Sequence, residues 1–457
     1  MKLQKITIKY FRCFEALTID LEQDVNVIVG TNGAGKSALL DAIALALLDI
    51  TFTPYDAERV RSINRNNKEL HYSRTAARGI FLSVDDIHIV PTIQDTFIGR
   101  KNHVCIGAEG IDDSLTPIFW QQKFDYKQTE ESSGFNVTLD TDKIHEYIDK
   151  RWEAVQKDKL SCVDVPAYYR AQRRFSKTPA LENIFNVKIE RPLALQNTMD
   201  AGADYSTVCQ WFYLRENSEL RERAKTNDKR FEYPDLKSMR HAIKNTIEGV
   251  EQVYFDGSTP PHLMVNIRKN NTVEILSLDQ LSDGYRNLLA LIMDFARRLA
   301  VANPYLENPL ESPGILLIDE IELHLHPKWQ QTIIPNLRKV FPNTQLIVTT
   351  HSPQVLTTVD CQKIRILKDN NVYSVTESTK GAEAKRMLEN ILETKSRPPD
   401  SEIGKKIKTI YDLINEDKLD DAQKEIDHLE NFKMHEPSIL EAESIITCKR
   451  WEKEVGL

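Results

Sequence analysis

Hydrophobic and polar positions follow a clear plan over the first fifty residues. Residues 3–8 and 16–21 alternate apolar and polar side chains, which predicts two half-buried strands. Residues 25–29 (VNVIV) form an almost continuous apolar run, typical of a strand buried on both faces. Glycines follow, and residues 36–50 are rich in alanine and leucine, which predicts a helix packed on the sheet. A strand, a glycine loop and a helix in this order indicate the start of an α/β domain.

A second set of buried strands is predicted far downstream. Residues 315–318 and 346–349 are short apolar runs, and residues 327–340 between them have the spacing of a helix. The long segment between the two sets is more polar and irregular, which indicates an insertion with a helical lobe. The elements expected in it are a strand at 163–169 and helices at 204–226 and 235–250.

The chain becomes charged and helical from about residue 376. Its apolar positions recur at helical spacing, and a Pro-Pro pair at 398–399 interrupts the pattern. The pattern predicts helices at 382–393, 403–415, 419–431 and 437–454. The chain as a whole is therefore expected to be α/β, with a helical insertion and a helical carboxyl-terminal region.

Composition and charge exclude several classes of protein. The 457 residues are 41% hydrophobic and 28% charged, which argues against collagen-like, low-complexity and largely disordered chains. With 60 basic and 68 acidic side chains the formal net charge is −8. Non-specific nucleic-acid binding through overall charge is therefore not expected, although the sequence still allows a local basic surface. The six cysteines show no CxxC spacing, and no apolar run is long enough for a bilayer. We expect a cytoplasmic protein without a zinc site, a disulfide framework or a membrane span.

The strongest chemical signal is GTNGAGKS at residues 30–37, a complete GxxxxGK[ST] loop between the predicted strand and helix. The glycines let several backbone N–H groups point inward, and the positive end of the following helix faces the same place. Lys36 is expected to reach the β- and γ-phosphates of a nucleotide, and the Ser37 hydroxyl to ligate Mg²⁺. A chance glycine-rich turn would lack this placement. The nucleotide-binding residues predicted from the motif are Gly30, Gly33, Ala34, Gly35, Lys36, Ser37 and Ala38.

Acidic residues end the buried strand at 315–318. Asp319 is expected to hold Mg²⁺, directly or through water, and Glu320 to polarise the attacking water as general base. A solvent-facing acidic pair at a strand end would look the same in isolation. After the next strand, the segment TTHSP places His351 where an imidazole can contact the γ-phosphate or the water. A lone histidine there would more often be structural, so the assignment depends on the other motifs.

The segment LSDGYR opens an apolar helix at 288–302. Ser282 and Gly284 at a helix start form another anion-binding end, although a simple serine N-cap explains the pattern equally well when it is taken alone. One nucleotide cannot use two such ends from opposite sides of one domain. The second end is therefore expected to act on a nucleotide held by a partner subunit.

The order of these motifs resembles the ABC-type ATPases of the RecF, SMC and OLD group. This resemblance implies a P-loop ATPase head with a mixed sheet and flanking helices, and head-to-tail dimers that enclose two ATP–Mg²⁺. The stretch ELHLHP from Glu322 resembles the group's D-loop, and Asn32 is implied to contact phosphate. Arg12 matches an amino-terminal FR pattern and is implied to touch nucleotide, and the candidates for the Q-loop residue are Gln172 and Arg174. Each composite site would combine Lys36, Ser37, Asp319, Glu320 and His351 of one chain with Ser282, Asp283 and Gly284 of the other.

The compact head, the segment YYRAQRRF, Trp211-Phe212 and the short helical end resemble the PtuA family, the ATPases of Septu-type and related retron anti-phage systems. This implies a homodimer or a higher even-numbered oligomer that regulates a separate, PtuB-like HNH-type nuclease, with DNA bound directly or through that partner. The segments would be an amino-terminal head lobe at 1–95, an insertion with one strand returning to the head at 96–255, a carboxyl-terminal head lobe at 256–375 and a helical interaction region at 376–457.

Two other functions remain to be weighed. A RecF- or SMC-like repair ATPase that binds DNA directly would need a basic face. Two clusters of basic residues could form such a face, although charge runs of this kind are usually ordinary solvated surface. They are Arg170, Arg173, Arg174 and Lys177, and Arg221, Arg223, Lys225, Lys229 and Arg230. A self-contained OLD-type nuclease is disfavoured, because the acidic residues after 376 lie in a helical, polar context and no HNH-type array is found. The chain is therefore expected to be an ATPase without a nuclease motif of its own.

Overall fold

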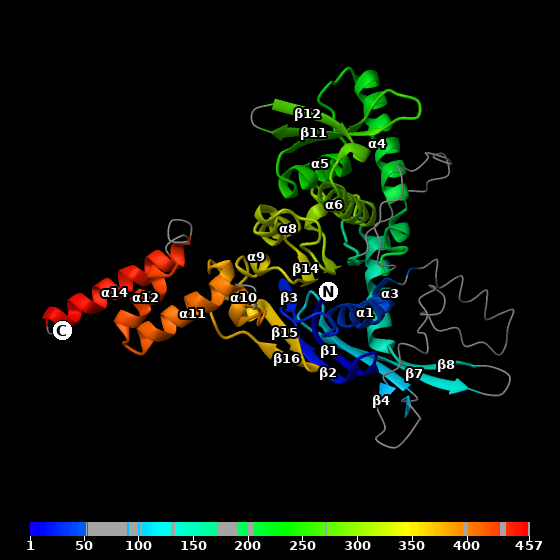
Figure 1. Ribbon diagram of the computed structural model, residues 1–457. Coiled ribbons are helices and arrows are strands. Elements are labelled where there is room, and N and C mark those ends of the chain that lie inside the picture. Colours follow the sequence, from blue (N-terminus) through cyan, green and yellow to red (C-terminus); the bar gives the residue numbers. More distant parts are fainter. Residues whose placement is uncertain are drawn as a thin grey trace. The chain divides into compact units, whose positions relative to one another are not determined.

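The computed structural model describes residues 1–51, 53, 89–90, 99–100, 103–128, 133–171, 190–199, 205–269, 272–395, 401–429 and 436–455. The chain divides into two compact units, Met1–Met387 and Leu388–Leu457 (Figure 1). The larger unit is α/β with mixed sheets, as the sequence predicts. None of its described helices, nor any in the smaller unit, is both long and apolar enough to cross a bilayer.

A six-stranded sheet forms the centre of the larger unit. Its order is β16-β15-β3-β14-β13-β9, with five parallel strands and β16 antiparallel at one edge. Every residue of β3, β9, β13 and β14 is buried, which explains why their sequences are mostly apolar. The strands are β3 (Val25–Val29), β9 (Val165–Tyr169), β13 (Gly314–Ile318), β14 (Thr344–Thr349), β15 (Ile364–Lys368) and β16 (Asn371–Ser374).

A five-stranded antiparallel sheet of order β2-β1-β6-β7-β8 lies in the same unit. Its strands are β1 (Lys2–Phe11), β2 (Phe14–Asp20), β6 (His103–Ile111), β7 (Pro117–Gln128) and β8 (Ser133–Asp140), and a separate pair is β4 (Ile89–Val90) with β5 (Gly99–Arg100). Because β6 pairs directly with β1, the segment 96–255 contributes far more than one returning strand, and the expected boundary at residue 95 cuts through this sheet. The sequence feature that indicates these strands is a period of two. In β7 every second residue, namely Ile118, Trp120, Gln122 and Phe124, is buried.

Helices pack around both sheets. Helix α1 (Lys36–Leu47) packs against β1 and β6 and is followed by a short 3₁₀ turn, whereas α6 (Asp283–Ala302) packs against β9 and two helices of the insertion. The single helix expected at 327–340 is two helices, α7 (Pro327–Gln330) and α8 (Ile333–Val340). Pro335 explains the break, because a proline ring clashes with the carbonyl four residues earlier, at Gln331. The other helices of this unit are α3 (Asp142–Lys157), α9 (Pro353–Leu356) and α10 (Ala384–Asn390), the last of which runs across the boundary between the units.

The insertion forms a helical lobe with its own small sheet. It contains α4 (Tyr205–Thr226), α5 (Pro234–Thr246) and the antiparallel strands β10 (Val250–Phe255), β11 (Leu263–Lys269) and β12 (Thr272–Ser277). The helix expected at 235–250 ends at Thr246, because Gly249 takes a left-handed conformation (φ 84°) and the chain then enters β10. Helix α5 packs along α6, which connects the lobe to the head.

The smaller unit contains α11 (Glu402–Asn415), α12 (Leu419–Asp427) and α14 (Pro437–Val455). One buried face of each helix contributes to a common apolar core that includes Ile410, Ile426 and Ile439. The unit therefore has a core of its own.

Candidate functional site

Four parallel strands end at the same edge of the central sheet, and a motif follows each of them. The register pairs Ile318 with Val348 and with Tyr169, and Thr349 with Ile28. Because parallel strands have their carboxyl ends together, the loops after β3, β9, β13 and β14 converge there. This edge is where open α/β sheets bind ligands.

The glycine loop between β3 and α1 takes the conformation that its sequence predicts. Gly33 and Gly35 have φ of 82° and 96°, which side chains with a Cβ rarely adopt. A Cβ on Gly35 would also lie 2.6 Å from the Cys13 Sγ and 2.7 Å from the Phe14 Cζ, so the turn after β1 packs directly against the loop. Asn32 is exposed at the tip of the loop, Ala34 is half-buried and Ala38 is buried in α1.

Lys36 lies at the first position of α1 with its ammonium group turned back over the loop. The Nζ donates hydrogen bonds to the carbonyls of Gly30 and Thr31, both at 3.0 Å. Burial lowers the pKa of Lys36, while the nearby charge of Asp319 acts in the opposite direction. The lysine is thus a cation held at the mouth of the glycine loop.

The two predicted Mg²⁺ ligands are in contact. The Ser37 Oγ donates to the Asp319 Oδ2 at 2.8 Å, although 282 positions separate the two residues. Mg²⁺ prefers octahedral oxygen ligands at about 2.1 Å, which places adjacent ligand atoms about 3 Å apart. A hydroxyl and a carboxylate at this separation therefore fit Mg²⁺, with water and phosphate oxygens as the remaining ligands.

Thr349 fixes both acidic residues after β13. Its Oγ1 donates to the Asp319 Oδ1 at 2.6 Å and accepts the backbone N–H of Glu320 at 2.8 Å. Glu320 has a positive φ of 47°, a conformation that costs a non-glycine residue on the order of 1–3 kcal/mol and occurs mainly at functional sites. Asp319 and Glu320 directly follow β13, and the two hydrogen bonds of Thr349 hold them at this edge.

Glu322 organises the loop that contains His351. Its carboxylate accepts the Thr350 hydroxyl at 2.7 Å and the His351 backbone N–H at 2.6 Å. Burial, followed by the charge of Lys36, lowers the pKa of His351, so the imidazole is neutral at pH 7. The sequence indicated Glu322 only as part of the resemblance to a D-loop, and Thr349 gave no signal beyond its place at a strand end.

The serine-led helix start is exposed. Ser282 is the N-cap residue of α6, but its side chain accepts no N–H group of that helix in this fully described segment. Gly284 is buried against the backbone carbonyl of His324, so a side chain there would collide with the loop after Glu322. Asp283 forms an ion pair with Arg286, and the Tyr285 ring meets Trp329 edge-on at 4.4 Å. The start of α6 and the D-loop-like turn therefore pack against each other.

Arg12 lies in the turn after β1 that packs on the glycine loop. Its guanidinium forms an ion pair with Asp41, which lies further along α1 from Lys36. Arg170, at the end of β9, binds the same carboxylate at 2.6 Å. Gln172, Arg173, Arg174 and Lys177 lie outside the described residues.

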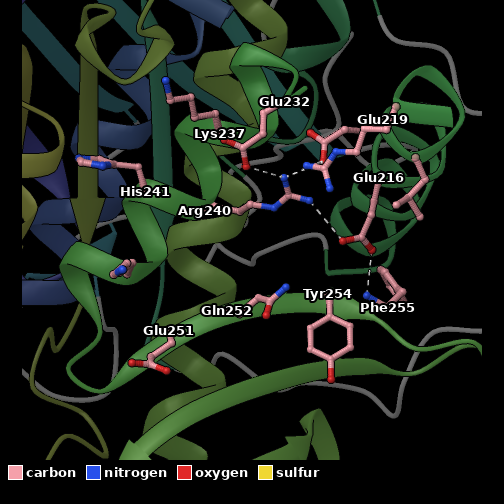
Figure 2. A pocket seen from close by; sticks show the side chains of 13 residues that line it. Glu216, Glu219, Glu232, Lys237, Arg240, His241, Glu251, Gln252, Tyr254 and Phe255 are labelled. Carbon is pink, nitrogen blue, oxygen red and sulfur yellow. Dashed lines mark hydrogen bonds and ion pairs between the residues drawn. The ribbon is translucent and has the colours of Figure 1, made fainter. Parts of the chain in front are cut away.

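One member of the second basic cluster, Arg223, lines a pocket of about 670 Å³ between α4, α5 and β10, whose wall carries both basic side chains and four glutamates (Figure 2). Glu219 is buried in its wall and accepts from Arg223 at 2.7 Å and from Arg240 at 2.9 Å. Within the described part of the chain, Lys237 and Lys244 on the same wall form no ion pair. The other predicted cations of the cluster, Arg221, Lys225, Lys229 and Arg230, lie around the end of α4.

Comparisons with known proteins show that this chain is similar to ATPases. The family model described as "AAA domain, putative AbiEii toxin, Type IV TA system" matches residues 123–357, about half of the chain, and the model "AAA ATPase domain" matches residues 1–158. "Retron Ec83 probable ATPase" of Escherichia coli is 29% identical over 99% of this chain and 88% of its own length. "Retron Vc95 probable ATPase" of Vibrio cholerae is 29% identical over 87% of this chain and 80% of its length. "Septu protein PtuA" of Bacillus mycoides is 38% identical over 20% of this chain and 13% of its length.

Proposed function

This chain belongs to the AAA-domain ATPase family, and from that premise we propose that it hydrolyses ATP in two composite sites of a head-to-tail dimer and thereby regulates a separate HNH-type nuclease. The observation that carries the proposal is the hydrogen bond between Ser37 and Asp319. It joins the glycine loop to the acidic strand end at a separation that suits two oxygen ligands of one Mg²⁺.

The residues around this contact have distinct roles in the proposed reaction. The loop amides and Lys36 bind the phosphates, and Ser37 with Asp319 would hold Mg²⁺, which neutralises charge on the phosphate oxygens. Glu320 takes the proton of the attacking water as general base, a role worth on the order of 10²–10⁴ in rate. Neutral His351 donates a hydrogen bond to the γ-phosphate from a position that Glu322 fixes.

The composite arrangement is supported by the exposed start of α6. Ser282 leaves the first N–H groups of a 20-residue helix without a side-chain cap within the described residues, and such groups bind anions. Gly284 lets the loop that contains His324 in the same chain pack closely against this helix start. A γ-phosphate held by the partner subunit fits this helix end.

A mixing experiment tests the arrangement. Ser282→Arg should leave ATP binding intact but block head pairing, and Lys36→Ala should abolish binding, so neither variant alone turns over ATP. A mixed dimer has one intact site out of two, so an equimolar mixture should regain about a quarter of the wild-type turnover per chain if the chains pair at random, and about half if only mixed pairs form. Ser218→Arg, on an exposed face of α4, is the matched control and should keep full turnover. Turnover by Ser282→Arg alone would rule out the trans contact.

The nuclease partner is supported by the names of the relatives, which are retron and Septu proteins, and DNA binding by this chain alone is the second candidate function. The cations of the insertion, around the pocket of Figure 2, favour that second candidate. Duplex binding by the purified chain, measured between about 50 and 200 mM salt, should be weak and lost at the upper value. Tight binding at that salt would favour the repair function, whereas copurification with a small nuclease encoded nearby supports the first.

A further inference from the structure

Asp41 connects three separate segments beside the glycine loop. It lies on α1 and is buried, with a side chain that is 8% exposed. Its carboxylate receives Arg12 from the turn after β1, Arg170 from the end of β9, and the Tyr168 hydroxyl at 2.7 Å. Arg170 binds through both its Nε, at 3.1 Å, and its Nη2, at 2.6 Å.

The four side chains of this cluster together carry a net positive charge. Two guanidinium groups are always protonated, whereas Asp41 supplies one negative charge. Burial and the charge of Asp41 raise the pKa of Tyr168, so the phenol stays protonated and donates to the carboxylate rather than adding a second negative charge. Guanidinium groups such as these two bind anions such as phosphate through charge-assisted hydrogen bonds.

The cluster lies at the edge of the sheet where the phosphate loop ends. The turn that contains Arg12 packs against Gly35 through Cys13 and Phe14. The strand that precedes Arg170 is in register with the strand that precedes Asp319, and the Asp319 N–H donates to the Tyr169 carbonyl at 2.9 Å. Arg170 therefore follows β9 at the same level at which the acidic pair follows β13.

Both arginines combine a buried anchor with an exposed part. The Arg12 and Arg170 side chains are 34% and 49% exposed, while the carboxylate that joins them is buried. A buried carboxylate that binds two planar guanidinium groups fixes their rotamers and leaves part of each accessible to a ligand. Arginine binds phosphate in a planar, bidentate manner.

We propose that Arg170 is a second arginine of the nucleotide site, which contacts the phosphates of ATP together with Arg12, and that Asp41 is the positioning residue that holds both. This inference rests on the proposed function and adds two residues to it.

Substitutions in the full-length chain test the inference through ATP binding and through separate KM and kcat values. Arg170→Ala should raise the Kd and KM for ATP about tenfold and change kcat less than about twofold, because a charge-assisted contact is lost without loss of the base. Arg170→Lys should recover only part of the affinity, since lysine keeps the charge but not the planar fork. Asp41→Asn should raise KM about fivefold, and the double variant should fall short of the product of the two single effects.

The controls separate a role in binding from a role in folding. Arg215→Ala breaks a comparable two-contact ion pair with Asp235 on the insertion, at 2.7 and 2.9 Å, and should leave KM unchanged. Wild-type ATP affinity in Arg170→Ala would overturn the inference, as would an Asp41→Asn variant that is thermally destabilised but binds ATP normally. Lys36→Ala distinguishes the levels of failure: if it also binds ATP, the proposed function itself is wrong.

Discussion

Replacing Glu320 with glutamine is expected to lower ATP turnover about 10²–10⁴-fold while ATP stays bound. Glutamine keeps the shape of the side chain but cannot accept the proton of the attacking water. The ligands of the phosphates and of Mg²⁺, Lys36, Ser37 and Asp319, are unchanged, so the nucleotide should accumulate unhydrolysed and hold the two heads together. Single-turnover kinetics and the mass of the ATP-bound species in solution measure both effects.

The matched control for this prediction is Glu311→Gln, an exposed residue before β13, which should hydrolyse ATP at the wild-type rate. Glu322→Gln is a more demanding comparison, because it makes the same chemical change two residues away. In the wild-type chain the Glu322 carboxylate accepts hydrogen bonds from the Thr350 hydroxyl and the His351 backbone N–H. The Glu322→Gln variant should therefore lose part of the rate of ATP hydrolysis, because His351 is displaced. Wild-type turnover in Glu320→Gln would show that another group acts as the base.

The convergence of the predicted residues at one edge of the sheet could be expected from the sequence, because they lie within short motifs at the ends of buried strands. An apolar run followed by Asp319 and Glu320 fixes both the strand and the edge at which its carboxylates emerge. The glycine loop does the same for Lys36 and Ser37. Once β3 and β13 belong to one parallel sheet, their loops must meet, and the hydrogen bond between Ser37 and Asp319 follows from that topology.

The residues that position the site could not be predicted in the same way. Thr349, Glu322 and Asp41 act through partners far away in sequence, and no local pattern distinguishes Asp41 from any other acid on a helix. Their roles depend on which strands become neighbours, for example β9 beside β13. A buried carboxylate with two arginines is visible only when the three segments are packed together.

The fold shows a similar division between local and long-range information. The break between α7 and α8 is encoded locally by Pro335, and the end of α5 by Gly249, so closer reading of the sequence could have found both. The pairing of β6 with β1 joins segments that are far apart along the chain. A strand with one polar face, such as β7, gives a weak signal until its partner is known.

Replacing Lys36 with alanine is expected to weaken ATP binding at least about 100-fold and to abolish turnover. The ammonium group would donate charge-assisted hydrogen bonds to the phosphates, each worth about 1.5–3 kcal/mol, and no other residue in the fully described first turn of α1 is a cation. The loop should stay folded without the ammonium group. Burial of this charge is itself unfavourable, as the lowered pKa of Lys36 indicates. The tip of the loop is exposed, so water can replace the lysine as hydrogen-bond donor to the Gly30 and Thr31 carbonyls. The melting temperature without nucleotide should therefore stay within about 2 °C of wild type, and the increase that ATP normally produces should disappear.

The matched control is Lys363→Ala, a lysine of the same unit whose ion pair with Asp24 lies away from the loop. It should retain both ATP affinity and the ATP-dependent increase in melting temperature. If Lys36→Ala still gains thermal stability from ATP, the nucleotide binds elsewhere on the chain. The convergence of the Ser37, Asp319 and His351 loops at one edge of the sheet would then need a different explanation.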